Sequence, residues 1–175
     1  IHPDPRQLNE AAEKLKLSTQ PIIIAGGGIL YSEAEKELSD FAKKHNIPVT
    51  PTVMGIGCMT KDDPYYIGAI GCLGEGSSNS LSKDTDLALA IGTKLGDFTT
   101  GSWSNFQNED FKLVSINTAR FDVTKHLATP VISDAKIGLL ELSKALGDWR
   151  APNNWYERSI DERKKWDSYV EKQSE

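Results

Sequence analysis

The chain has 175 residues, with 20 Lys and Arg against 25 Asp and Glu, which gives a formal net charge of −5. This length is typical of one domain, and 38% hydrophobic with 26% charged residues is ordinary for a globular protein. The absence of a basic block and of an apolar run near the ~20 residues of a membrane span disfavours nucleic-acid partners and a membrane location. Two cysteines, Cys58 and Cys72, form no disulfide or zinc pattern, so we expect a reducing, cytoplasmic setting.

The N-terminal segment has the pattern of a helix. Asp4 can act as its N-cap, and Pro5 suits the first helical position. Apolar residues then recur at helical spacing, at Leu8, Ala11, Ala12, Leu15 and Leu17. Pro21 ends this pattern, and a strand follows.

The next unit is a strand, a glycine turn and a second helix. The continuous apolar run 22–25 is typical of a strand covered on both faces. It leads directly into three glycines, Gly26, Gly27 and Gly28. The following helix is predicted to begin with Ser32 as N-cap and Glu35 as its capping-box partner, and to end at 45–46.

Strands and helices continue to alternate along the rest of the chain. The chain then passes 65–68 and a glycine-rich turn at 71–76, and a helix is predicted to follow this turn, through Leu81 to about Asp84. A longer helix is predicted from the cap Asp134 to Gly147. Further strands are predicted at 47–50, 87–91, 112–116 and 130–132. This order predicts an α/β sandwich with a mainly parallel sheet, whose right-handed crossovers bring the 26–28 and 92–97 loops to one edge.

The first glycine turn has two interpretations. Backbone N–H groups at a strand-to-helix turn can bind an anion, but a tight turn with close strand–helix packing also needs glycine. A dinucleotide fingerprint requires a third glycine where Tyr31 stands and an acidic residue at the end of the second strand, where Thr50, Pro51 and Thr52 stand. The signal for a nicotinamide cofactor is therefore weak.

The loop 92–101 is the stronger candidate for binding. It follows the most apolar strand and is rich in small hydroxyl side chains, with Lys94 and Asp97 among them. Such a loop can bind a phosphate or a polyhydroxylated substrate; alternatively, Asp97 and Thr99 only satisfy backbone donors. We favour the functional interpretation because the loop is longer than a simple connection requires.

Two further candidates carry less weight. His126, beside Lys125, could exchange protons with a substrate, although a lone histidine is more often a surface or helix-end residue. The pair 62–63 could hold a metal ion, but adjacent carboxylates before a proline more often form a solvated turn.

The runs PIIIAGGGILYSEAEKELSDFAKKHNIPV and DLALAIGTKLGDFTTGS resemble the central domain of thiamine-diphosphate-dependent enzymes, over roughly residues 5–147. That family includes acetohydroxyacid synthase, pyruvate oxidase and benzoylformate decarboxylase. Within it, GTKLGDFTTGSWSNFQN and SINTARFDVTKH are most similar to the hydrolases that open 3D-trihydroxycyclohexane-1,2-dione in myo-inositol breakdown.

The resemblance implies a Rossmann-like three-layer sandwich with a six-stranded, mainly parallel sheet over 1–149. Residues 150–175 then form a linker and a connector helix toward a C-terminal domain. Thiamine diphosphate and Mg²⁺ are held outside this chain, since Trp149 follows Gly147 and Asp148 where the family's metal motif has a second glycine. The implied full-length enzyme is a homo-oligomer with N- and C-terminal thiamine-binding domains, and no catalytic residue lies in this piece.

In flavin-containing relatives the central domain binds FAD at positions that match six residues here: Gly26, Gly27, Gly28, Gly92, Thr93 and Lys94. The hydrolase resemblance implies no flavin, so we expect no bound FAD. Four residues of the second loop are expected to border the active-site entrance: Asp97, Phe98, Thr99 and Thr100.

Three alternatives stay open: a free-standing FAD- or ADP-binding module, the same domain of an acetohydroxyacid synthase-like enzyme, and a structural oligomerisation domain. Both ends of the sequence have the pattern of a cut, so we expect a piece of a longer protein.

Overall fold

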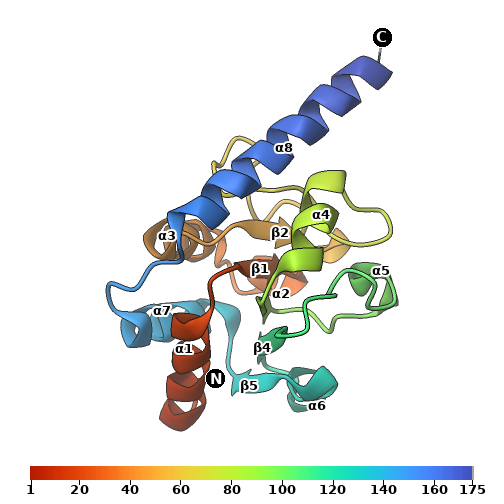
Figure 1. Cartoon of the computed structure of the whole chain (residues 1–175). Helices are drawn as coiled ribbons and strands as arrows, with labels where there is room; N and C mark the ends of the chain where they lie inside the picture. The colour runs from red at the N-terminus through yellow and green to blue at the C-terminus, as the bar shows by residue number, and fades with distance from the viewer. Residues whose placement is uncertain (175) are drawn as a thin grey trace.

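A parallel sheet of five strands, in the order β2-β1-β3-β4-β5, forms the centre of the computed structural model, which describes residues 1–174 (Figure 1). The strands are β1 (Pro21–Ala25), β2 (Val49–Pro51), β3 (Leu87–Ile91), β4 (Lys112–Asn117) and β5 (Thr129–Ile132). All neighbouring pairs are parallel, as the alternating pattern predicts. Both edge strands are short and each contains a proline, Pro51 in β2 and Pro130 in β5.

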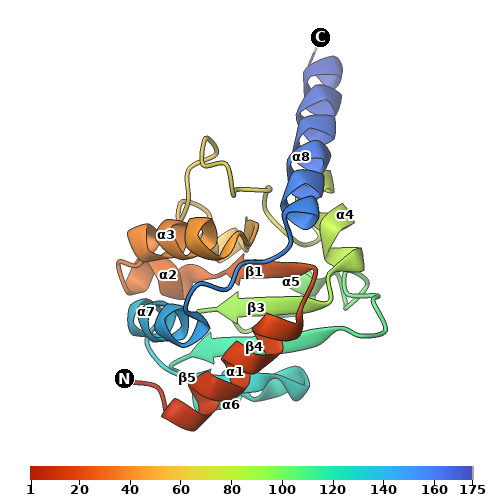
Figure 2. The same ribbon diagram turned by 60° about the vertical axis from the view of Figure 1, so that its left-hand side comes forward.

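Helices cover both faces of the sheet (Figure 2). The helices are α1 (Pro5–Leu17), α2 (Gly27–Tyr31), α3 (Glu35–His45), α4 (Gly76–Asp84), α5 (Asp97–Thr100), α6 (Arg120–Val123), α7 (Ala135–Leu146) and α8 (Asn153–Gln173), with 3₁₀ turns η1 (Val53–Gly55) and η2 (Lys125–Leu127). Alternate strand residues face opposite layers: Ile23 and Leu89 pack with α1, α3 and α7, whereas Ile22 and Ala88 pack with α4 and Trp155 of α8. This arrangement is a Rossmann-like three-layer sandwich.

The predicted sixth strand is wrong for the described residues. The segment 65–67 runs beside β2 and exchanges two backbone hydrogen bonds with Val49, 2.8 Å to the Tyr65 carbonyl and 3.0 Å from the Ile67 N–H. Only one parallel bridge, Val49 to Tyr66, results. Gly68 has a φ of +94°, which turns the chain out of the extended conformation, so no regular ladder forms although the Ile70 N–H still donates to the Pro51 carbonyl at 3.0 Å.

The predicted N-cap at Ser32 is also wrong. Ser32 closes α2, and its hydroxyl donates to the Asp134 carboxylate at 2.6 Å instead of capping the next helix. The chain then turns at Glu33, with φ 48°, and α3 begins at Glu35 without a side-chain cap. A charged acceptor from a distant element therefore outcompetes the local backbone.

The caps predicted at Asp4 and Asp134 are confirmed. The Asp4 carboxylate accepts from the Arg6 N–H at 2.8 Å, and Asp134 accepts from the N–H groups of Lys136 and Ile137. Gly147 ends α7 with a φ of +62°, a conformation that glycine adopts without strain. Both cysteines are free thiols. No helix in the described part of the chain is long and apolar enough to cross a bilayer.

The helix α8 begins as part of the core and ends in solvent. The Trp155 side chain is buried, and its indole N–H donates to the Pro21 carbonyl at 2.8 Å. Ser159, one turn later, is also buried. The last turns extend beyond the body in both views (Figure 1, Figure 2), and Tyr169 and Val170 are exposed there.

Candidate functional site

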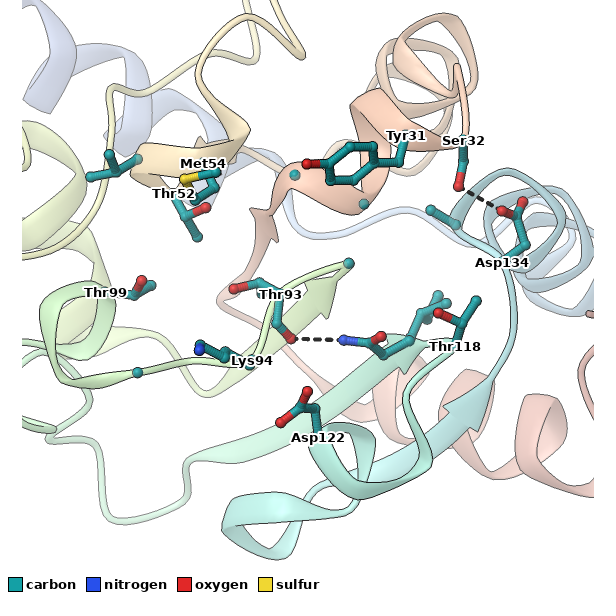
Figure 3. Close-up of a pocket in the computed structure, with 18 of the residues that line it drawn as sticks. Tyr31, Ser32, Thr52, Met54, Thr93, Lys94, Thr99, Thr118, Asp122 and Asp134 are labelled. Atoms are coloured by element: carbon teal, nitrogen blue, oxygen red, sulfur yellow. Dashed lines mark hydrogen bonds between the residues drawn. The ribbon is translucent and has the colours of Figure 1, made fainter.

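A cavity of about 710 Å³ lies at the carboxyl ends of the strands. The strand order reverses between β1 and β3, and in open α/β sheets this switch point is where ligands bind. The loops that follow all five strands contribute to its lining, and Figure 3 shows Tyr31, Lys94 and Asp122 around the same space. The volume is within the usual range for small-molecule pockets.

The glycines after β1 and β3 form one backbone contact. The Gly28 N–H donates to the Gly92 carbonyl at 3.0 Å, and a Cβ on Gly28 would lie 2.5 Å from the Gly92 Cα. A Cβ on Gly26 would lie 2.3 Å from the Gly92 oxygen, and Gly92 itself has a φ of +61°. The prediction that these loops meet at one edge is confirmed. Close loop packing is sufficient to explain these three glycines, without any ligand.

Most residues singled out by sequence line the cavity. They are Gly27, Gly28, Gly92, Thr93, Lys94, Asp97, Phe98 and Thr99. The structure places Gly26 and Thr100 behind this surface: Gly26 packs on Gly92, and Thr100 is fully buried, where its hydroxyl accepts from the Trp103 N–H at 3.2 Å. The N-cap residue of α5 is Gly96, and no side chain caps this helix, so capping of α5 does not explain Asp97.

Residues at the end of β4 and in the loops after β4 and β5 complete the cavity, and sequence reasoning did not assign them to it. Asn117 donates from its side-chain amide to the Thr93 carbonyl at 3.2 Å, which joins the loops after β3 and β4. Asp122 forms an ion pair with Lys125 at 2.8 Å. The predicted strands 112–116 and 130–132 could have pointed to these residues, because the residues that follow parallel strands lie at one edge of the sheet.

Hydrogen bonds within the protein stabilise the ionised carboxylate of Asp134. Partial burial acts to raise the pKa of this carboxyl, but hydrogen bonds from the Ser32 hydroxyl and from backbone N–H groups at the start of α7 outweigh it and lower the pKa. The carboxylate therefore stays ionised and holds α2 against α7 on one side of the cavity. The lining has three carboxylates, at positions 97, 122 and 134, and one lysine, Lys94.

This donor set does not fit a magnesium diphosphate group. Such a group needs several carboxylate or amide oxygens on one cation and an excess of positive charge or N–H donors around the phosphates. Residues 1–174 contain no cluster of three or more His, Cys, Asp or Glu side chains placed to hold a metal. Gly147 and Asp148 follow the end of α7, whereas Asp134, at its start, borders the cavity.

The two weaker candidates take structural roles. Asp63 accepts from the Tyr65 N–H at 2.9 Å and from the Ser39 hydroxyl at 2.7 Å, so it stabilises a turn. His126 lies in an exposed turn with a φ of 60° and packs on Trp103, with ring centroids 4.4 Å apart. Neither borders the cavity.

Comparisons with known proteins place the chain in a family. Residues 8–142 match the model described as thiamine pyrophosphate enzyme, central domain. The chain is 36% identical over 166 residues to a 3D-(3,5/4)-trihydroxycyclohexane-1,2-dione hydrolase of Bacillus cereus strain AH820, which covers 95% of this chain and 26% of that protein. It is 41% identical over 140 residues to hydrolase 1 of the same description from Bacillus cereus strain ZK / E33L, covering 80% of this chain and 22% of that protein.

A third relative is the 3D-(3,5/4)-trihydroxycyclohexane-1,2-dione hydrolase of Clostridium perfringens strain 13, which is 35% identical over 160 residues, 91% of this chain and 25% of that protein. The chain thus spans about a quarter of the length of these relatives. The family match covers most of the sandwich, from α1 to α7. The chain belongs to the family of central domains of thiamine pyrophosphate enzymes.

Proposed function

We propose that this chain is the central, non-catalytic domain of a thiamine-diphosphate-dependent hydrolase that opens trihydroxycyclohexane-1,2-dione in myo-inositol breakdown. The observation that carries the proposal is 35–41% identity to proteins with this name along 80–95% of the chain. Thiamine diphosphate supplies the carbon nucleophile and the electron sink for C–C cleavage in enzymes that use it.

In this proposal the cofactor and Mg²⁺ are bound by the flanking N- and C-terminal domains of a cytoplasmic homo-oligomer. Residues 1–149 are the central domain, and 150–175 are a linker and a helix that leads toward the C-terminal domain. The lack of a fitting donor set within residues 1–174 supports that division. So does the position of α8, which leaves the body after its buried first turns.

The second loop supplies the border of the active-site entrance in this proposal. Phe98 is 72% exposed at the mouth of the cavity, which suits contact with a neighbouring domain or a substrate. The residues concerned are Asp97, Phe98 and Thr99, with Thr100 as their buried support.

The test is dione hydrolysis by the full-length protein and by the 175-residue chain. We expect ring opening only with the full-length protein supplied with thiamine diphosphate and Mg²⁺, and the measurement is the amount of ring-opened product. Hydrolysis by this chain alone would refute a non-catalytic role. A full-length protein that instead condenses two 2-oxo acids would favour the acetohydroxyacid synthase-like alternative.

A nucleotide-binding module is the second candidate, and the volume and position of the cavity favour it. The six residues matching flavin-binding positions, namely Gly26, Gly27, Gly28, Gly92, Thr93 and Lys94, surround or support this cavity. Against FAD, the Gly28 N–H is already bonded to Gly92 and the lining is rich in carboxylates. Thermal unfolding of the chain with added FAD or ADP distinguishes the candidates: a saturable rise in melting temperature supports the module, and we expect none with FAD.

A further inference from the structure

A cluster of three side chains joins α8 to the loop between β2 and α4. The Glu75 carboxylate accepts from the Tyr66 hydroxyl at 3.0 Å, from the Ala69 N–H at 3.3 Å and from Arg163 of α8 at 2.9 Å. The Arg163 guanidinium also lies 5.1 Å from the centre of the Tyr66 ring. The Arg163 and Glu75 side chains are only 18% and 20% exposed, so removal of either charge leaves the other poorly solvated.

The Tyr66 hydroxyl is a proton donor in this cluster. Burial and the adjacent Glu75 carboxylate raise the pKa of Tyr66 to about 12. The Tyr66 hydroxyl therefore keeps its proton and continues to donate to Glu75 at physiological pH.

Two glycines let side chains of this region pack directly on the backbone. A Cβ on Gly76 would lie 2.7 Å from the Trp166 ring, so α8 rests directly on the start of α4. A Cβ on Gly68 would lie 2.8 Å from the Glu75 Cβ. These contacts have little free space, so a shift of α8 cannot be absorbed by side-chain rotation alone.

The same loop contacts the cavity wall at its other end. The Cys72 N–H donates to the Phe98 carbonyl at 2.8 Å, and a Cβ on Gly71 would lie 2.1 Å from that oxygen. The side chain of Asn79 in α4 bonds both backbone groups of Gly71. Its oxygen accepts from the Gly71 N–H at 3.0 Å, and its amide nitrogen donates to the Gly71 carbonyl at 2.9 Å. Phe98 and Thr99 belong to α5, which lines the cavity.

We propose that Arg163 is a positioning residue for the cavity: by holding Glu75 it fixes the 69–75 loop, and through that loop it fixes α5. The position of α8 and the width of the cavity mouth are then coupled. Coupling of this kind is reciprocal, so a ligand that immobilises α5 also tightens α8 on the body. The inference is independent of the substrate, because it uses only contacts within this chain.

Hydrogen exchange of the 175-residue chain, followed by mass spectrometry, tests the coupling. The informative amides are hydrogen-bonded backbone N–H groups in two segments. Ile70, Cys72 and Glu75 belong to the 69–75 loop, and Thr99, Thr100 and Ser102 belong to α5 and the residues just after it. For Arg163→Met, which keeps the aliphatic stem, we expect exchange about tenfold faster in both segments, because a charge-assisted bond is lost. Exchange in β1 and β3 stays at the wild-type rate.

A matched control is Arg158→Met on the same helix. Arg158 pairs with Asp84 at an exposed surface, so exchange near the cavity should not change. If Arg163→Met does not fold, Arg163→Lys replaces it. The lysine keeps the charge but cannot pair with both Glu75 and Asp167 through one planar group. We then expect a smaller increase in the exchange rate of both segments.

Gly71→Ala tests the coupling from the cavity side. Its Cβ would clash with the Phe98 carbonyl, and its φ of +112° is unfavourable for alanine. We expect faster exchange in 97–102 and, by reciprocity, a smaller increase in α8 around Arg163. Faster exchange in α8 and 66–76 with an unchanged 97–102 segment, in the Arg163 variant that folds, would overturn the proposal and leave Arg163 as a local anchor.

Discussion

The contact between Gly28 and Gly92 shows how single residues set the shape of the cavity. At this point two loops approach within hydrogen-bond distance, and neither can carry a side chain without moving the other. The glycines and their positions after the strands can be predicted from the sequence. Their mutual contact cannot be predicted in this way, because it joins residues 64 positions apart and no local pattern encodes it.

We expect Gly28→Ala to destabilise the chain by about 1–3 kcal/mol in urea unfolding, as overpacking of a close contact does. The new Cβ would lie 2.5 Å from the Gly92 Cα, and this clash outweighs the gain in helix propensity within α2. Gly96→Ala is the matched control in the same cavity, because its Cβ meets nothing within 4 Å. Its effect should stay within about 0.5 kcal/mol. Equal effects of the two substitutions would contradict the packing role of Gly28.

His45 makes the stability of the chain dependent on pH. It is fully buried; its Nδ1 donates to the Trp149 carbonyl at 2.7 Å, and its Nε2 accepts from the Ser143 hydroxyl at 2.9 Å. Burial lowers the pKa of this imidazole below 6.5, and the nearby Lys44 and Arg150 charges add to the effect, against the opposing Trp149 hydrogen bond. The unfolded chain therefore binds more protons than the folded chain below that pH, and the free energy of unfolding falls as the solution is acidified.

Urea unfolding at pH 7.5 and pH 5.5 measures this effect. We expect wild type to lose stability on acidification and His45→Gln to lose less, although the variant starts from a lower stability because it packs less well. Parallel losses in the two proteins would show that other groups cause the pH dependence.

At the scale of elements, local signals predicted the ends of helices where the cap is satisfied within its own turn. Asp4, Asp134 and Gly147 are examples. The prediction failed at Ser32, whose hydroxyl is taken by a carboxylate 102 residues away. The helix predicted to follow the 71–76 turn and to end near Asp84 is confirmed as α4, which begins at Gly76. The partner of Ser32 belongs to a distant element, and a single sequence does not show it.

The buried first turns of α8 make this helix a structural part of the sandwich. We expect Trp155→Ala to destabilise the chain by about 3–5 kcal/mol, because it removes a large buried ring. Tyr169→Ala, on the exposed end of the same helix, should cost no more than about 0.5 kcal/mol. Thermal unfolding monitored by circular dichroism compares them.

Trp155→Phe provides a milder version if the alanine variant does not fold. It keeps a buried ring but leaves the Pro21 carbonyl without its 2.8 Å donor, so a loss of about 1 kcal/mol is expected. A wild-type melting temperature in both Trp155 variants would mean that α8 contributes nothing to the core.

At the scale of the whole molecule, the sandwich and its ligand edge were predictable from alternating strand and helix patterns. The identity of a ligand was not, because the cavity wall is assembled from loops after five different strands. Asp122 and Asp134 illustrate this, since each is an ordinary helix-end carboxylate in sequence and becomes a lining residue only through the fold.

We expect thiamine diphosphate with Mg²⁺ to leave the melting temperature of this chain unchanged, because no donor set within residues 1–174 fits the pair. A site filled at a hundred times its dissociation constant would add about 2.7 kcal/mol, which a thermal shift detects readily. Inorganic diphosphate is the control for weak anion binding at Lys94. A saturable rise that requires the complete cofactor and the metal would place a thiamine site in this chain.

The two edge strands have a consequence for assembly. Pro51 and Pro130 lack an N–H, and the strands that contain them are only three and four residues long. The outer side of β2 is also occupied by the 65–67 segment. A second molecule therefore finds almost no free ladder along which to add its own strand, which protects the protein from edge-to-edge aggregation. Any homo-oligomer it enters must be built from side chains on helices and loops, and not by continuing the sheet from one subunit into the next.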